Sequence, residues 1–206
     1  ELISDKKTAS FLNKMVDDTT NEFRNICKSL NNLREITPSI LDRTASRGEQ
    51  LMGTLFAETL KASGLNATYI DATEVIKVQK ESGIYGPDLA ASTVEIKKTV
   101  LPLLKDGVVI IPGWIGSNKD GQLVTLGRGG SDLSASVLGH ALEAEKVTLY
   151  KEVDGLMTAD PRQVPEARVI PEMHYREATE LAYYGAKVLH SRTIIPLLKH
   201  QIPLVI

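Results

Sequence analysis

QLVTLGRGGSD, residues Gln122–Asp132, is the stretch that decides the fold of this chain. Its β-branched residues predict a strand, its glycines predict a tight turn, and the residues after it predict a helix. Ser131 or Asp132 is available as the N-cap of that helix. The helix itself is indicated by apolar residues at three- and four-residue spacing: Leu133, Val137, Leu138 and Ala141.

The same turn predicts an anion site. The first backbone N–H groups of a helix have no partner inside the helix and bind anions. Gly127, Gly129 and Gly130 let the backbone approach a phosphate, and Arg128 adds a planar positive charge. A plain structural connection is the alternative. The turn lacks both the Gly-Lys-Ser/Thr ending of a Walker A loop and the spacing of the dinucleotide fingerprint.

Composition narrows the class of protein. A chain of 206 residues with 42% hydrophobic content can bury the core of one domain, and no apolar run is long enough to cross a bilayer. A net charge of −2 provides no electrostatic drive toward nucleic acid, so we expect small-molecule partners. The single cysteine, Cys27, fits a reducing cytoplasm, and its helical spacing with Phe23, Ile26 and Leu30 predicts a packed core position.

The chain divides into a helical portion, at about residues 1–64, and an α/β portion, at about 65–206. Helices are predicted over residues 11–33, from Pro38 onward, and over Glu49–Ala62 before Gly64. Short strands are then predicted at Ala67–Ile70, Val108–Ile111, Leu123–Leu126, Val147–Tyr150 and Ile202–Val205, with a hairpin turn at Gly116–Gly121. Helices are predicted between them at Ala91–Leu104, Ser131–Glu143 and Tyr175–Leu189. This order predicts a mainly parallel sheet covered on both faces.

Ligands of such sheets bind where the strands end. Four segments there have suitable chemistry: PGWIG at 112–116, GRGGSD at 127–132, KEVDGLMTADPR at 151–162, and the segment with Lys187 and His190. We expect these segments to converge on one site.

Five segments, in order and spacing, resemble the aspartate kinases of the amino acid kinase family. They are SRGEQL at 46–51, PGWIGSNKDG at 112–121, TLGRGGSDLSA at 125–135, LYKEVDGLMTADPR at 149–162 and ELAYYGAKVLH at 180–190. The resemblance implies a three-layer αβα sandwich that transfers the γ-phosphoryl group of ATP to the side-chain carboxylate of L-aspartate. The product, 4-phospho-L-aspartate, opens the biosynthesis of lysine, threonine and methionine. Mg²⁺ would be held mainly by the phosphates of ATP.

The resemblance also implies roles on the amino acid side of the site. Arg128 would grip the α-carboxylate of the substrate, and Glu49 would receive its ammonium group. Backbone and hydroxyl donors would come from Gly129, Gly130 and Ser131. Asp132 would organise the reacting centre; helix capping is its alternative role.

On the nucleotide side, the resemblance places ATP along Lys151–Arg162, with Arg162 at the phosphates. Three positions there differ from many relatives, which have threonine, aspartate and tyrosine where this chain has Lys151, Glu152 and Met157. Lys187, beside Val188, matches a nucleotide-contacting lysine; a surface lysine at a helix end is the alternative.

Three further features have competing interpretations. His190 is followed by Ser191 where relatives usually have proline, and we expect it to pack or to form a hydrogen bond. Trp114 is predicted either in the core or in the substrate loop. Asp154–Gly155 is either part of the nucleotide segment or a tight turn.

The family's opening strand, which carries Lys-Phe-Gly-Gly-Thr-Ser, and its pair of regulatory domains are not among these 206 residues. We therefore expect a chain cut at both ends, with little or no kinase activity alone, from a parent that is a homo-oligomer although this piece can be monomeric. Stand-alone kinase and kinase–homoserine dehydrogenase fusion both stay open. A relative acting on acetylglutamate, glutamate or a nucleoside monophosphate is one alternative function, and a non-catalytic nucleotide-binding regulatory subunit is another.

Overall fold

The computed structural model describes residues 6–81, 84–160, 162–184 and 189–206. It begins with three helices, α1 (Lys6–Leu33), α2 (Pro38–Ala45) and α3 (Arg47–Ala62). The Thr37 hydroxyl caps α2 by accepting the Ile40 N–H at 3.3 Å, as expected of a threonine–proline helix start. Gly64, at φ +84°, ends α3. The predicted helices of this region are confirmed.

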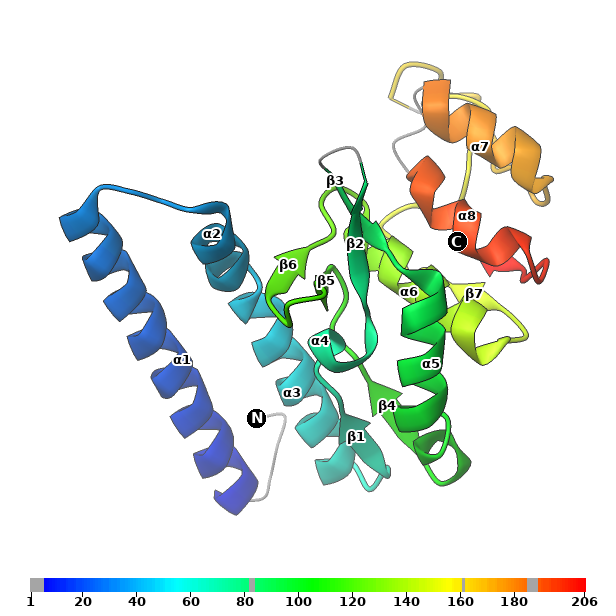
Figure 1. Ribbon diagram of the computed structural model, residues 1–206. Helices are drawn as coiled ribbons and strands as arrows, with labels where there is room; N and C mark the ends of the chain where they lie inside the picture. The colour runs from blue at the N-terminus through cyan, green and yellow to red at the C-terminus, as the bar shows by residue number, and fades with distance from the viewer. Residues whose placement is uncertain (1–5, 82–83, 161, 185–188) are drawn as a thin grey trace.

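Helix α1 lies at the edge of the molecule, alongside α3 (Figure 1). Leu12 is its one fully buried residue within the described chain, and an ion pair from Glu22 to Arg47 ties it to α3. Cys27 is exposed, so the prediction of a packed core position is wrong. Its apolar neighbours do recur at helical spacing, but in the described part of the chain α1 packs against α3 along one side.

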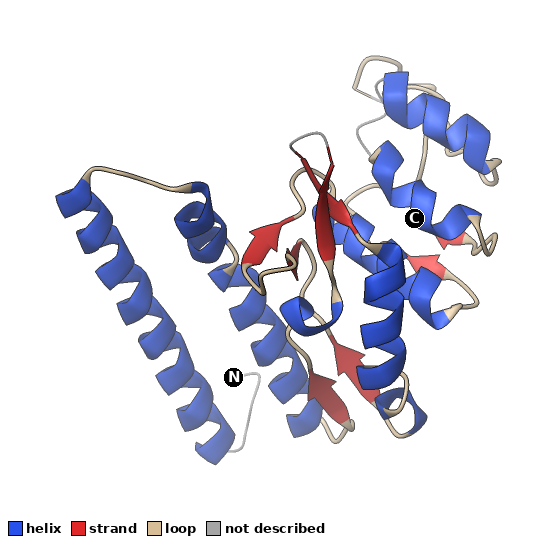
Figure 2. Ribbon diagram, in the orientation of Figure 1, coloured by secondary structure: helices blue, strands red, loops and turns tan. Residues whose placement is uncertain are grey.

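The strands form four short pairs within the described residues (Figure 2). Two pairs are parallel: β1 (Ala67–Tyr69) with β4 (Val108–Ile110), and β7 (Val147–Thr148) with β8 (Leu204–Val205). Two are antiparallel: β2 (Val78–Glu81) with β3 (Ile84–Pro87), and β5 (Ile115–Ser117) with β6 (Leu123–Thr125). The five predicted strands and the hairpin turn between β5 and β6 are confirmed. The α/β class is confirmed as well, built here from short strand pairs.

Helices alternate with these strands. They are α4 (Ala72–Val75), α5 (Leu89–Thr99), the short 3₁₀ helix η1 (Leu103–Lys105), α6 (Gly130–Leu142), α7 (Tyr175–Tyr184) and α8 (Ser191–Leu198). The predicted helix Ala91–Leu104 is two elements, because Pro102 disfavours helical geometry at the residue before it. No described helix combines the length and apolar character needed to cross a membrane.

The β2–β3 hairpin and α8 were not predicted. The hairpin has little apolar alternation, and it is supported by a cross-strand pair in which the Lys80 ammonium lies 5.6 Å from the centre of the Tyr85 ring. Helix α8 contains Pro196, which argues against a helix in the sequence. Both elements also contact distant parts of the chain: the Tyr85 carbonyl accepts from Arg192, and α8 packs against α6.

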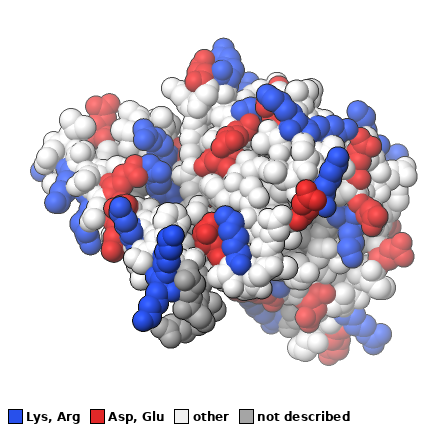
Figure 3. Space-filling model, turned by 90° about the horizontal axis from the view of Figure 1, so that it is seen from below, with Lys and Arg blue, Asp and Glu red and all other residues white. Residues whose placement is uncertain are grey.

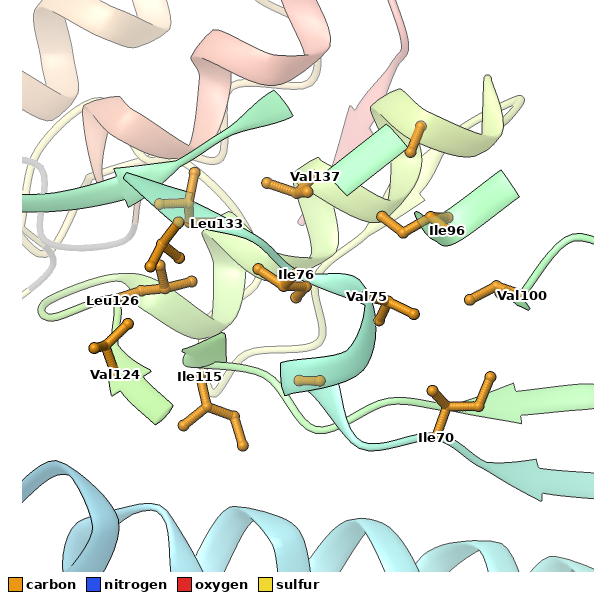
Figure 4. Close-up of a cluster of buried hydrophobic side chains, with 13 residues drawn as sticks. Ile70, Val75, Ile76, Ile96, Val100, Ile115, Val124, Leu126, Leu133 and Val137 are labelled. Carbon is orange, nitrogen blue, oxygen red and sulfur yellow. The ribbon is translucent and has the colours of Figure 1, made fainter. Parts of the chain in front are cut away.

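Helix α6 connects the two buried clusters of the molecule. Its Leu133, Val137 and Ala141 belong to the larger cluster, which also contains residues of α4, α5, β5 and β6 (Figure 4). On another side it packs against α8, whose Ile194 and Leu197 belong to the second cluster. The start of α6 is therefore held by contacts on two sides.

Candidate functional site

The glycine-rich loop is the segment Gly127–Gly130 between β6 and α6. Gly127 and Gly129 have φ values of +71° and +72°, in the left-handed region that favours glycine. Gly129 is the N-cap of α6, so the expectation that Ser131 or Asp132 caps the helix is wrong. Gly129 adopts the left-handed conformation, and the helix begins at the next residue, Gly130.

Close packing leaves no room for side chains at two of these glycines. A Cβ atom on Gly129 would lie 2.7 Å from Cβ of His190. A Cβ atom on Gly130 would lie 2.6 Å from Cδ1 of Trp114 and 2.9 Å from Cβ of Leu126. The loop is thus enclosed by the segment before α8 and by the PGWIG segment.

The loop presents free N–H donors, and two carbonyls at its start accept hydrogen bonds. Within the described part of the chain, the amides of Gly127, Arg128 and Gly129 have no hydrogen-bond acceptor. The carbonyl of Gly127 accepts from Trp114 Nε1 at 2.9 Å, and that of Leu126 accepts from Arg192 Nη1 at 3.1 Å. Free N–H groups just before a helix start, beside an exposed arginine, have the chemistry that suits an anion.

Trp114 has an unusual backbone conformation beside this loop, with φ at +70°. Its N–H donates to the buried Ser134 hydroxyl at 3.0 Å, and its half-buried ring packs against the larger core cluster. Both interpretations of Trp114 therefore apply, because the ring packs on the core while its indole N–H holds the glycine-rich loop.

Asp132 lies in the first turn of α6, where its carboxylate is paired with Lys151. The Lys151 Nζ atom lies 2.8 Å from Asp132 Oδ2, and both side chains are mostly shielded from solvent. Lys151 follows β7, so the pair brings the predicted nucleotide segment to the glycine-rich loop.

The other three predicted segments therefore meet at GRGGSD, the segment that contains the loop. PGWIG reaches it through Trp114, KEVDGLMTADPR through Lys151, and the last segment through His190. His190 caps α8, its Nδ1 accepting the Arg192 N–H at 3.3 Å, which agrees with the predicted packing and hydrogen-bond role. Lys187 and Val188 lie outside the described residues.

The proposed ligands of the amino acid are less closely gathered. Arg128 and Ser131 are exposed, and within the described chain neither side chain has a hydrogen bond or ion pair. Glu49 is half-buried in the first turn of α3, and no described contact joins it to Arg128. Their roles stay predictions.

The remaining residues predicted on the nucleotide side, Glu152, Met157 and Arg162, lie in the long segment between β7 and α7. Glu152 is exposed. Met157 pairs with Val169 in an antiparallel bridge, next to a hydrogen bond from Thr158 N–H to the Arg168 carbonyl at 2.9 Å. Arg162 is exposed, and its backbone N–H donates to the Asp160 carboxylate at 2.9 Å. No described contact joins these three residues to the glycine-rich loop.

A carboxylate network that the sequence did not reveal lies beside SRGEQL. Asp71 accepts from Gln50 Nε2 at 2.6 Å, from the Tyr69 hydroxyl at 3.2 Å, and from the Thr73 hydroxyl and amide at 2.6 and 2.9 Å. Burial raises the pKa of Asp71, but the four hydrogen bonds outweigh burial, so its pKa lies below the usual value. Burial, and then the nearby Asp71 charge, raise the pKa of Tyr69.

Arg192 is the second feature missed from the sequence. Its guanidinium bonds the carbonyl of Leu126, directly after β6, and the carbonyl of Tyr85 in β3. The available signal was its place two residues after His190, in the segment already assigned to the site.

Surface charge and metal-ligating groups give further information about which ligands the described residues can bind. On the face seen in Figure 3, positive and negative side chains are interspersed. No group of three or more His, Cys, Asp or Glu residues in the described ranges is arranged to hold a metal ion.

Comparison with known proteins identifies the fold. The sequence model of the amino acid kinase family matches residues 3–206. This chain belongs to the amino acid kinase family. It resembles the lysine-sensitive aspartokinase 3 of Escherichia coli, with 40% identity over 167 residues, which cover 81% of this chain and 37% of that protein. It also resembles the bifunctional aspartokinase/homoserine dehydrogenase of Buchnera aphidicola, with 36% identity over 200 residues, covering 95% and 24% of the two chains.

A solved structure has the same arrangement. The E. coli aspartokinase III in complex with aspartate and ADP superposes on this member of the amino acid kinase family with a TM-score of 0.86 and 34% identity. The match covers 93% of this chain and 42% of that one. The chain thus spans less than half the length of these relatives.

Proposed function

We propose that this chain is part of the catalytic domain of an aspartate kinase. The reaction transfers the γ-phosphoryl group of ATP to the side-chain carboxylate of L-aspartate and yields 4-phospho-L-aspartate. This is the first step in making lysine, threonine and methionine. The proposal extends to the chain an activity named in its relatives.

One observation carries the proposal. The glycine-rich loop offers the free amides of Gly127, Arg128 and Gly129 next to the Asp132–Lys151 pair, in a loop that resembles that of aspartate kinases. Phosphoryl transfer needs positioning and charge neutralisation more than covalent participation by the protein. Backbone donors and fixed charges supply these two requirements.

The amino acid would be recognised by its two charged ends. Arg128 is exposed and without a described partner, so its planar guanidinium is free to donate two hydrogen bonds to the α-carboxylate. Glu49 would take the ammonium group. Gly129, Gly130 and Ser131 would add donors. The side-chain carboxylate is then the group left to accept phosphate.

The nucleotide would lie on the other side of the loop, along Lys151–Arg162, Lys187 and Val188. Lys151 already lies beside Asp132, which supports a meeting of the two substrates there. The residues fit a magnesium nucleotide, because the free amides suit phosphate oxygens and Asp132 is a carboxylate beside them. Mg²⁺ bound to ATP would neutralise phosphate charge.

We also propose a cytoplasmic setting and a homo-oligomeric parent protein. The absence of a described membrane-spanning helix supports the former. Chloroplastic relatives from Arabidopsis thaliana make a plastid the other setting to test.

Calorimetry on the 206-residue chain tests the proposed function. We expect L-aspartate to bind at least about tenfold more tightly than L-glutamate, since one additional methylene typically costs that much. Arg128→Lys should weaken aspartate binding about tenfold, because lysine cannot form the bidentate pair. Arg24→Lys, on the exposed face of α1, is the matched control.

Two outcomes would contradict the proposal. Preferential binding of acetylglutamate, glutamate or a nucleoside monophosphate would assign another substrate within the family. Binding of ADP with no amino acid ligand would instead favour a non-catalytic nucleotide-binding subunit.

A further inference from the structure

Arg192 lies in the first turn of α8 and donates to two backbone carbonyls in different parts of the chain. Its Nη1 donates to the Leu126 carbonyl at 3.1 Å, and its Nη2 donates to the Tyr85 carbonyl at 2.9 Å. Leu126 immediately precedes the glycine-rich loop, whereas Tyr85 belongs to β3. One guanidinium therefore connects α8, the β2–β3 hairpin and the start of the loop.

Neither acceptor of Arg192 carries a charge. In the described parts of the chain, no carboxylate forms an ion pair with this guanidinium. Hydrogen bonds from a charged donor are stronger than those between neutral groups, so both carbonyls are held firmly. The positive charge also remains available to favour an anion near the loop.

The bond to Leu126 acts on the peptide group that contains the Gly127 amide. A carbonyl that accepts a charged hydrogen bond is polarised, and the N–H of the same peptide becomes a better donor. Trp114 bonds the next carbonyl, that of Gly127, whose peptide contains the Arg128 amide. The free amides of Gly127 and Arg128 thus each belong to a peptide group whose carbonyl accepts a hydrogen bond from a side chain.

The neighbouring His190 limits movement of the same region. Its Cβ lies where a side chain on Gly129 would have to be, and its ring nitrogen accepts the Arg192 N–H. The start of α8 consequently contacts the loop region at two points: Arg192 bonds Leu126, just before the loop, and His190 packs against Gly129.

We propose that Arg192 is a positioning residue, which holds the glycine-rich loop in its anion-binding conformation and couples that loop to the β2–β3 hairpin. This inference rests on the proposed function of the loop. Arg192 acts through the backbone of Leu126, and it needs no contact with substrate. Its fork geometry is required, because a lysine ammonium at the same place has no second arm directed at Tyr85.

The single tryptophan of the chain provides a direct readout. Trp114 is bonded to Gly127, so acrylamide quenching of its fluorescence reports on the loop without any ligand. We would compare Arg192→Gln and Arg192→Lys with the unaltered chain, and use Arg176→Gln on the exposed part of α7 as the matched control. ADP and aspartate affinities and the midpoint of thermal unfolding, Tm, would be measured on each.

We expect Arg192→Gln to increase quenching of Trp114 well below its Tm and to weaken ligand binding by about tenfold, the effect of losing charged hydrogen bonds. Arg192→Lys should recover part of both losses. A lower Tm with unchanged quenching and affinity would overturn the proposal, since Arg192 would then merely fasten α8.

Two further results separate the possible failures. If the unaltered chain binds neither ADP nor aspartate, the proposed function fails, while the quenching comparison still decides whether Arg192 positions the loop. If Arg192→Gln does not fold, Arg192→Lys decides: unaltered quenching and affinity in a folded lysine variant would contradict the need for a fork.

Discussion

Lys151 Nζ and Asp132 Oδ2 lie 2.8 Å apart, and this ion pair joins the segment after β7 to the first turn of α6. The pair sets opposite charges beside a loop whose free amides attract anions. A carboxylate there repels phosphate unless a cation lies between them. The balance between Asp132, Lys151 and a magnesium nucleotide is therefore open to direct measurement.

Removing the Asp132 charge should alter how nucleotide binding depends on Mg²⁺. We expect Asp132→Asn to tighten ADP binding about threefold without Mg²⁺, because a repelling charge is lost and Lys151 is released. Added Mg²⁺ should then improve affinity less than it does for the unaltered chain. Calorimetry with and without Mg²⁺ checks this, with the exposed Glu145→Gln as control. Equal Mg²⁺ dependence in both variants would count against a role for Asp132 near the phosphates.

Two glycines with nearly the same φ allow strain and crowding to be separated. Gly127→Ala has open space around it, so we expect only the conformational cost, about 1 kcal/mol of unfolding free energy. Gly129→Ala adds a 2.7 Å clash with His190 and should cost about 1–3 kcal/mol more. Urea unfolding measures both. Equal costs would show that His190 moves aside freely.

Burial of His140 should make stability depend on pH. Burial lowers its pKa, aided by His200 and Lys199 and opposed by the Pro196 carbonyl and Glu143. The unfolded chain, with a histidine pKa near about 6.5, binds a proton more readily than the folded chain. Stability should thus be full above about pH 6.5 and fall as pH drops toward the folded pKa.

The corresponding variant is His140→Gln, measured by urea unfolding at several pH values. It should flatten the stability profile between about pH 7 and 5, the range in which histidine titrates. His174→Gln, at an exposed position, is the control. A profile unchanged by His140→Gln would assign the pH dependence to other groups.

Asp71 should act at lower pH. Its folded pKa is lowered by hydrogen bonds, so its contribution is present above the unfolded value of about 3.9 and is lost as pH falls through the folded pKa. Asp71→Asn should reduce stability at pH 7 and weaken the acid dependence below about pH 4. Asp106→Asn, at an exposed turn, should change neither. If stability fell with pH in the same way for the Asp71 variant and the unaltered chain below about pH 4, the role of the network would be contradicted.

Activity of the 206-residue chain alone is the last test. The sequence contains no Lys-Phe-Gly-Gly-Thr-Ser segment, whose lysine in the family neutralises charge on the transferred group. We expect little or no aspartyl phosphate in a hydroxamate trap even where aspartate and ADP bind. Robust turnover would mean that this lysine is dispensable or replaced.

Local patterns predicted most of the fold. The strand, glycine turn and helix of residues 122–142 follow from β-branched, glycine and periodic apolar residues that act within one segment. The predicted N-cap of α6 was wrong. Ser131 and Asp132 are residue types that often cap helices, but the positive φ of Gly129 decides where this helix begins. The prediction that Cys27 is buried was wrong, because periodicity indicates the apolar side of a helix and does not indicate whether another element covers that side.

The sequence predicted the meeting of segments around the glycine-rich loop, whereas the roles of the site residues stay predictions. Convergence at the glycine-rich loop followed from the rule that ligands bind at strand ends. Arg192 and the contact of Asp71 with Gln50 were missed because each joins residues that are far apart along the chain. Such contacts leave no periodic signal in one sequence.

The hydrogen bond from Gln50 to Asp71 anchors one side of α3 to the residues after β1. Glu49 is the preceding residue, so its side chain leaves the helix about 100° around the axis from that of Gln50. An anchor on one side of the helix thereby sets the direction of its neighbour. Turning α3 about its axis would redirect Glu49 and would also strain the Gln50–Asp71 hydrogen bond, so this network helps to hold the orientation of the residue proposed to receive the substrate ammonium.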